Sequence, residues 1–375
     1  WTMSEYKITA YTHMGDFGQL LDRVKIEGSG LPAEDELSLA DFVSERCNTD
    51  CGDRIPGKGV IGFTKEDDAL ILEMDSCLFR GTFCITLEKN GQKIVVDKST
   101  ITEIKLYHEE LFKAVNDDGL IYRIYEPTAR GPRPLLLFLH GGGGCGTDNM
   151  LPLVDTLGAI HFAERCPDMY VLAPQAPEGA FSMEVMLARL AKGGDHFKVV
   201  LRNPVDNGPD ARGWTRPYLA LVTDLIRRMI AEGKVDPARV YVTGLSAGGF
   251  GTLKAVAVAP DLFAGCLPVC PSMNGESYPI LENFPEVPTW IATSYIDHQA
   301  ARHAYIMRAV QKLWDRGRKD VRFTIFTPEE LAEYGIGVEP DLPAKELYAQ
   351  NHNSWVLVYH NEYCMLDWLF SQRKH

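Results

Sequence analysis

The sequence predicts a doubly wound α/β domain at residues 119–375, preceded by a small β-rich domain at residues 1–118. In the larger part, short apolar runs alternate with amphipathic stretches of helical period, which is the pattern of strand–helix–strand units. One run, residues 134–139 (PLLLFL), is apolar throughout, as expected of a parallel strand covered on both faces. In the smaller part, short alternating runs are separated by turn residues, which indicates antiparallel strands.

The first part contains five runs with strand-like alternation, at residues 6–11, 59–63, 69–74, 83–88 and 93–96. Lys89-Asn90-Gly91-Gln92 separates the last two, and an Asn-Gly pair favours the positive φ angles of a tight hairpin. Strands at this spacing predict a β-sandwich of immunoglobulin-like type. It could shape the entrance of a pocket, bind a polymer or form a homo-oligomer.

The second part alternates strands and helices to its end. We expect strands at 120–125, 134–139, 169–172, 240–243, 264–269, 289–293 and 321–327, and helices at 217–231, 249–258, 301–316 and 355–370. In such a sheet the carboxyl ends of the strands carry the functional groups.

Charge and hydropathy exclude some partners. The formal net charge of the 375 residues is −13, and −10 of it lies in residues 1–118, which argues against binding to nucleic acid. No apolar run approaches the roughly 18–20 residues that span a membrane. We therefore expect neither nucleic acid nor a membrane as a partner.

The number of cysteines, nine, is odd and the chain is long, which argues against a small disulfide scaffold. Several of the nine cysteines lie in apolar strand-like runs, such as Cys266 and Cys270, and are interpreted as small core residues. Four of the nine (Cys47, Cys51, Cys77 and Cys84) could bind zinc, but the sequence has no CxxC pair, so we expect neither a metal nor a cofactor. This thiol content favours a reducing, cytoplasmic compartment, with Met3 as a possible native start. A secreted protein whose signal peptide has been removed would look the same.

A candidate nucleophile follows the strand at 240–243. The chain continues as GLSAGG (residues 244–249), so Ser246 lies in a G-x-S-x-G pattern between an apolar strand and a helix. The glycines permit a tight turn that lifts the hydroxyl clear of the sheet. An ordinary glycine-rich turn is the alternative, but the flanking elements favour a nucleophile.

A glycine run follows the strand at 134–139, as His140 and then residues 141–144. Backbone N–H groups in such a loop can approach a substrate oxygen closely, and we expect Gly142 and Ala247 to form an oxyanion hole. Gly141 and Gly143 are the alternatives to Gly142. No Gly-Lys-Ser/Thr follows, which excludes a phosphate loop. We expect His140 to hold this loop beside the substrate.

The acid and the base should follow Ser246 in that order. Asp297 comes directly after the strand at 289–293, at its carboxyl end, and His352 precedes the last predicted helix, where a loop can bring its imidazole to Ser246. The rival carboxylates and imidazoles are less well placed along the chain; they are Asp320, Glu329, Glu330, His298, His303 and His360.

These motifs carry a family resemblance. LHGGGG, YVLAPQAP, DPARVYVTGLSAGGFGT, VPTWIATSYID and HNSW resemble the polyhydroxybutyrate-depolymerase and feruloyl-esterase-like branch of the α/β-hydrolases, some of which have an immunoglobulin-like domain in front. The resemblance implies a carboxylesterase for small or aryl esters. Ser246, Asp297 and His352 match the catalytic positions of that branch.

Other features leave alternatives open. Residues 182–192 are amphipathic and form either a lid, within the long connection 178–214, or a helix packed on the surface. Gly143, Trp214 and Trp355 are candidates for contact with the substrate, although core packing is the default for a tryptophan. A serine peptidase of prolyl-oligopeptidase type shares the order of catalytic residues, but 118 residues are too few for its usual propeller. A binding protein on an inactive hydrolase scaffold is the third possibility.

Overall fold

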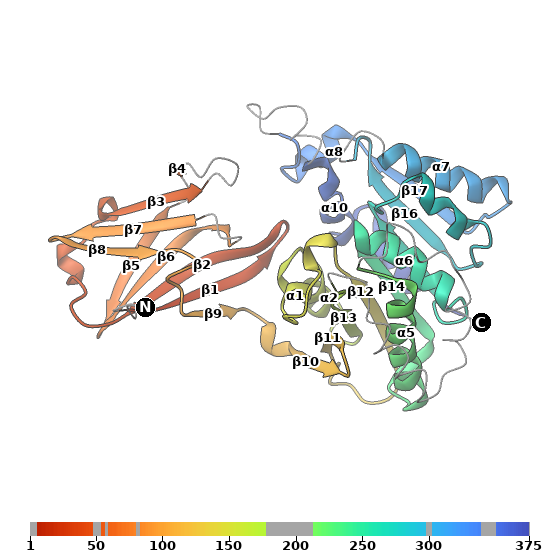
Figure 1. Ribbon diagram of the computed structural model, residues 1–375, viewed down its shortest axis with the longest axis horizontal. Coiled ribbons are helices and arrows are strands. Elements are labelled where there is room, and N and C mark those ends of the chain that lie inside the picture. The colour runs from red at the N-terminus through yellow and green to blue at the C-terminus, as the bar shows by residue number, and fades with distance from the viewer. Residues whose placement is uncertain are drawn as a thin grey trace. The chain divides into compact units, whose positions relative to one another are not determined.

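The computed structural model describes residues 6–47, 54–56, 59–79, 83–177, 213–297, 302–338 and 350–374. The chain forms two compact units, Trp1–Glu110 and Leu111–His375, which are described separately here (Figure 1). Within the described ranges, no helix has the length and apolar character needed to cross a membrane. The expected domain boundary after residue 118 stays a prediction.

The first unit is a pair of β-sheets. One sheet has the strand order β5-β6-β2-β1-β9 and the other the order β4-β3-β7-β8. All neighbouring strands are antiparallel except β1 and β9, which are parallel. Side chains from both sheets, among them Ile26, Leu72, Ile85 and Ile94, share one buried core. The strands are β1 (Lys7–Gly15), β2 (Gly18–Glu27), β3 (Phe42–Cys47), β4 (Arg54–Pro56), β5 (Val60–Glu66), β6 (Ala69–Leu78), β7 (Phe83–Lys89), β8 (Gln92–Val96) and β9 (Glu103–Leu106).

The small β domain is confirmed, and its immunoglobulin-like type stays a prediction. The predicted hairpin is present, since Lys89 pairs with Gln92 and the turn residues Asn90 and Gly91 have φ angles of 52° and 79°. Strand β2 was missed by the sequence analysis. Leu21, Val24 and Ile26 are its buried residues, and a register shift in this stretch breaks the alternation of two that marks a strand.

The second unit is built on an eight-stranded sheet with the order β10-β11-β13-β12-β14-β15-β16-β17. The β10–β11 and β11–β13 pairs are antiparallel and all later pairs are parallel, so the mostly parallel sheet is confirmed. The strands are β10 (Phe112–Asp117), β11 (Leu120–Tyr125), β12 (Arg133–Leu139), β13 (Tyr170–Pro174), β14 (Val235–Leu245), β15 (Gly265–Val269), β16 (Thr289–Ser294) and β17 (Val321–Phe326).

Helices cover this sheet on both faces. Alternate residues of β12 point to opposite sides. Leu135, Leu137 and Leu139 lie in one buried cluster with residues of α5 and α6. Phe138 points the other way, with its ring 5.8 Å from that of Phe162 in α2 and 6.2 Å from that of Tyr359 in α10. This two-sided burial explains the continuous apolar run in β12. Among the described residues, the α-helices with five or more residues are α2 (Ala159–Arg165), α5 (Arg216–Ala231), α6 (Ala247–Val258), α7 (Arg302–Asp315), α8 (Pro328–Glu333), α10 (Trp355–Tyr359) and α11 (Met365–Ser371).

The predicted helix at 355–370 is wrong in one respect, because the chain breaks between α10 and α11. Asn361, Tyr363 and Cys364 have φ angles of 74°, 53° and 55°, which no right-handed helix contains. The Asn361 side-chain oxygen accepts the backbone N–H groups of Leu366 and Asp367 at 2.8 and 3.1 Å. It thereby satisfies donors at the start of α11 that a continuous helix would not leave open. The possible lid at 182–192 lies outside the described residues.

Candidate active site

Ser246 occupies a strained turn between β14 and α6. Its φ and ψ angles are 56° and −117°, a conformation that L residues rarely adopt. Such a residue costs on the order of 1–3 kcal/mol and persists only where its surroundings hold it. Here the Ser246 N–H donates to the carbonyl of Val269 at 3.0 Å, and its carbonyl accepts the N–H groups of Phe250 at 3.1 Å and Ser272 at 2.9 Å.

Backbone contacts leave no room for side chains around this turn. A Cβ atom on Gly244 would lie 2.6 Å from the carbonyl oxygen of Leu139, and one on Gly248 would lie 2.0 Å from the same atom. On Gly249 it would lie 2.3 Å from the carbonyl oxygen of Val269. The glycines of the motif are therefore required by the close approach of α6 to β12 and β15.

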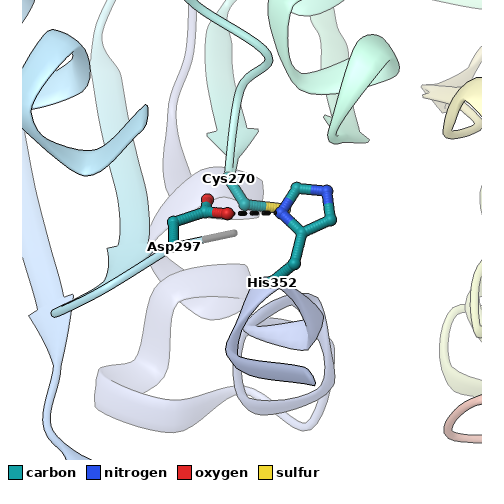
Figure 2. A group of neighbouring side chains, drawn as sticks. All are labelled: Cys270, Asp297 and His352. Atoms are coloured by element: carbon teal, nitrogen blue, oxygen red, sulfur yellow. Dashed lines mark hydrogen bonds and ion pairs between the residues drawn. The ribbon is translucent and has the colours of Figure 1, made fainter. Parts of the chain in front are cut away.

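Asp297 and the partly buried His352 form a hydrogen-bonded pair (Figure 2). Asp297 follows β16 and is fully buried, and His352 lies in the short turn Asn351–Asn353. The Asp297 Oδ1 and the His352 Nδ1 are 2.6 Å apart. The other carboxylate oxygen accepts the Thr293 hydroxyl at 3.2 Å. The ring of Trp355 packs edge to face against the imidazole, with 5.7 Å between the two ring centroids. The structure thus brings together the predicted acid and base, which are far apart in sequence.

Two neighbours of His352, Cys270 and Asp297, favour its charged form. Burial alone would lower the pKa of this imidazole, but the neighbouring Cys270 sulfur and the Asp297 carboxylate outweigh it and raise the pKa to about 9. Because the Asp297 carboxylate accepts a hydrogen bond from the Nδ1–H, the other ring nitrogen, Nε2, is the one that can act as a base.

Sequence analysis did not identify Arg302, which also faces this imidazole. Its Nη1 lies 3.0 Å from Nε2 and 3.2 Å from Nδ1 of His352, and 3.9 Å from the Asp297 Oδ1. A guanidinium has only donors, so its partner on the ring is the unprotonated Nε2. Arg302 lies in the first turn of α7, and no motif in the sequence marks it.

Cys270 is the second residue of the site that was not predicted as functional. It follows β15, is buried, and has a φ of 37°. The sulfur, a His352 ring nitrogen and an Asp297 oxygen lie within 4.8 Å of one another (Figure 2). Thiolate, imidazole and carboxylate are all zinc ligands. A metal on Nδ1 would have to replace the 2.6 Å hydrogen bond to Asp297, so we assign none.

His140 and Trp214 support the glycine loop from within. The His140 Nε2 accepts the Ala176 N–H at 3.0 Å, so its Nδ1 carries the proton and donates to the Gly141 carbonyl at 2.6 Å. Burial lowers the pKa of His140 to about 4, which keeps it neutral. The Trp214 Nε1 donates to the His140 carbonyl at 3.0 Å. Both side chains are buried, and their contact with substrate stays a prediction, as it does for Trp355.

The glycine loop lies beside Ser246. A Cβ atom on Gly141 would be 3.8 Å from that of Ser246, whereas one on Gly142 would have no heavy atom within 4 Å. A Cβ atom on Gly143 would meet the Asp155 carboxylate at 2.6 Å. Gly142 is exposed and faces open space, as a donor to a substrate oxygen would. The oxyanion-hole role of Gly142 and Ala247 stays a prediction.

Comparison with known proteins gives partial matches in sequence. A profile of the prolyl oligopeptidase family matches residues 222–320. A poly(3-hydroxybutyrate) depolymerase of Ralstonia pickettii is 28% identical over 163 residues, which are 40% of this chain and 29% of that protein. A bis(hydroxyethyl) terephthalate hydrolase of Streptomyces coelicolor is 34% identical over 126 residues, 32% of this chain and 40% of that protein. The chain thus spans well under half the length of these relatives.

One solved structure matches along the whole chain. It is described as a thermostable esterase, is 22% identical, and has a TM-score of 0.63 with 98% of this chain and 100% of that chain covered. The second unit has an α/β-hydrolase fold. In this fold the edge formed by the carboxyl ends of β14, β15 and β16 carries Ser246, Cys270 and Asp297.

Proposed function

We propose that the protein is a serine hydrolase that cleaves carboxylic esters through an acyl-enzyme on Ser246. The observation that carries the proposal is the Asp297–His352 pair, joined at 2.6 Å at the sheet edge where the strained Ser246 turn also lies. A carboxylate that orients an imidazole, beside a serine on a strand-to-helix turn, is the arrangement of serine hydrolases.

The proposed reaction has two halves. The His352 Nε2 takes the Ser246 proton while the Ser246 oxygen attacks the ester carbonyl. The backbone N–H groups of Gly142 and Ala247 donate hydrogen bonds to the oxyanion that forms. The imidazolium, stabilised by Asp297, gives its proton to the departing alcohol. Water then attacks the acyl-enzyme by the same route. Because Arg302 lies 3.0 Å from Nε2, its guanidinium has to leave that nitrogen before the proton can transfer.

The names of the relatives support the choice of a substrate class. Poly(3-hydroxybutyrate) and bis(hydroxyethyl) terephthalate are both esters, one aliphatic and one aromatic. We propose small or aryl carboxylic esters as substrates, which includes feruloyl and acetyl esters. A feruloyl ester and short-chain p-nitrophenyl esters, assayed side by side, rank these possibilities.

A fluorophosphonate probe tests the reaction type. We expect the probe to label the wild-type protein once, on the peptide that contains Ser246. Ser246→Ala should lose both the label and ester hydrolysis, while Ser99→Ala, at an exposed serine of the first unit, should keep both. Absence of covalent label on the wild type would refute the catalytic proposal and favour a binding protein on a hydrolase scaffold.

The profile match at residues 222–320 also supports a serine peptidase. A pair of substrates with the same acyl group, one an ester and one a peptide amide, separates the two activities. The ester proposal requires the larger kcat/KM for the ester. A larger kcat/KM for the amide would contradict it and establish the peptidase.

A further inference from the structure

The last residue of β15 and the three residues after it, 269–272, contact the candidate nucleophile at three points. We call this segment the β15 tail. The Val269 carbonyl accepts the Ser246 N–H at 3.0 Å, and the Ser272 N–H donates to the Ser246 carbonyl at 2.9 Å. The hydroxyl oxygens of Ser246 and Ser272 are 3.2 Å apart. The tail therefore holds the backbone of Ser246 on both sides and also touches its hydroxyl.

The same tail reaches the candidate base through Cys270. The Cys270 N–H donates to the Ala292 carbonyl of β16 at 2.8 Å, which anchors the residue between two strands. From there its sulfur lies in one group with the facing atoms of His352 and Asp297 (Figure 2). The tail thus touches the nucleophile with one side chain and the base with another.

The backbone conformation of Cys270 indicates that its side chain has a functional role. Its φ of 37° lies in the left-handed region, which glycine adopts without strain and a thiol-bearing residue does not. Strained residues of this kind gather at active sites, where their surroundings hold them in place. Ser246, at the end of the neighbouring strand, also has a positive φ, of 56°, and hydrogen bonds join the two segments.

One hydrogen bond does not fix an imidazole. The bond to Asp297 fixes the position of Nδ1, but the ring can still rock about that contact. Among the described residues, the charged and titratable groups that face His352 include Asp297, Cys270 and Arg302. Since Arg302 has to leave Nε2 in the proposed reaction, the contacts that can hold the ring throughout, besides the bond to Asp297, include the Trp355 ring and the Cys270 sulfur.

We propose that the β15 tail is a positioning element that fixes the nucleophile and the base relative to each other. Ser272 holds the Ser246 hydroxyl, and Cys270 holds the His352 ring. This inference rests on the proposed serine hydrolase function. Both are positioning residues, because they act through Ser246 and His352.

The test for Cys270 uses the full chain and a matched control. Cys266 is an equally buried cysteine on β15 whose sulfur lies 3.1 Å from the Thr289 hydroxyl, so Cys266→Ala removes a thiol away from the imidazole. We expect Cys270→Ala to lower kcat by about 10- to 100-fold, with little change in KM, since a misplacement near 1 Å costs about 100-fold. The acid limb of its pH profile should move to lower pH, because a neighbour that raises the pKa of His352 is gone.

Two further variants keep the Cys270 test decisive. Cys270→Ser retains a group that can contact the imidazole and should recover part of the lost kcat. Cys270→Gly adopts the positive φ without strain, so it folds if alanine does not, and it should be as slow as Cys270→Ala. Wild-type kcat in folded Cys270→Gly would show that only the backbone matters and would overturn the role of Cys270.

Ser272→Ala should behave differently. It should lower kcat and slow fluorophosphonate labelling but leave the pH profile in place, because Ser272 contacts the nucleophile and not the base. If the Ser272 and Cys270 variants fold and match wild type in kcat and pH profile, the inference is wrong and the proposed function stands. If wild type is not labelled on Ser246, the proposed function itself fails.

Discussion

Removal of the Asp297 carboxylate tests the proposed mechanism directly. Asn fills the same space but cannot stabilise an imidazolium and favours the wrong ring tautomer. We expect Asp297→Asn to fold normally and to lose about 10,000-fold in kcat, the loss seen for this change in serine proteases. Steady-state kinetics on an activated ester measures it.

Asp320 supplies the control for that variant. It precedes β17, at the opposite end of the strand from the site, and pairs with Arg318. Asp320→Asn should keep kcat. An equal loss of kcat in the two variants would show that the effect of Asp297→Asn is structural.

The pH dependence follows from His352. The imidazole has to be neutral to accept the Ser246 proton, and its pKa is raised from 6.5 to about 9. We therefore expect kcat/KM to rise with pH across this interval and to level off above it. Since His140 has a pKa of about 4, it stays neutral throughout and contributes no limb there. A limb at or below pH 6.5, measured after subtraction of spontaneous hydrolysis, would contradict the environment described for His352.

At the scale of elements, the contact of α6 with β12 sets the nucleophile turn. A methyl group on Gly248 would lie 2.0 Å from the Leu139 carbonyl oxygen, a backbone atom that cannot rotate away. We expect Gly248→Ala to lower the free energy of unfolding, measured with urea, by about 1–3 kcal/mol or more. Gly142→Ala places its methyl group in open space and should leave the stability unchanged. Equal stability of the two variants would mean that α6 is not packed this closely.

The sequence predicted best the elements whose local pattern matches their burial. Residues 134–139 of β12 are all apolar because helices cover both faces of the sheet there, and Asn90-Gly91 directly marks the hairpin between β7 and β8. Strand β2 was hidden by a register shift, and the break after α10 depends on hydrogen bonds from the Asn361 side chain. Neither leaves a periodic trace in the sequence.

The same distinction applies to the site. Ser246 and the glycine loop are contiguous motifs, so a single sequence shows them. Cys270 and Arg302 face His352 only because three strand ends and a helix meet there, and no spacing between them is characteristic. Cys270 was interpreted as a small core residue, and it is indeed buried, but burial alone could not reveal its neighbour.

At the scale of the whole molecule, the boundary between the two units determines which fragment of the chain can fold and react by itself. The compact units divide after Glu110, whereas the change in sequence pattern falls after residue 118. Strand β10 lies between the two points and pairs with β11 along its whole length, from Phe112 opposite Tyr125 to Asp117 opposite Leu120. Phe112 is buried there, with its ring 6.0 Å from that of Tyr125.

Two truncated chains, 111–375 and 119–375, test where the catalytic unit begins. The longer one keeps the edge strand β10, so we expect it to unfold cooperatively and to react with a fluorophosphonate at about the rate of the full chain. The shorter one loses Phe112 and leaves the backbone groups of β11 unpaired at the sheet edge, which promotes aggregation. We expect it to unfold at lower urea concentration. Equal stability of the two truncated chains would place β10 outside the core of this unit. A separate comparison, of the mass in solution of the full chain with that of chain 111–375, would show whether residues 1–110 form an oligomer.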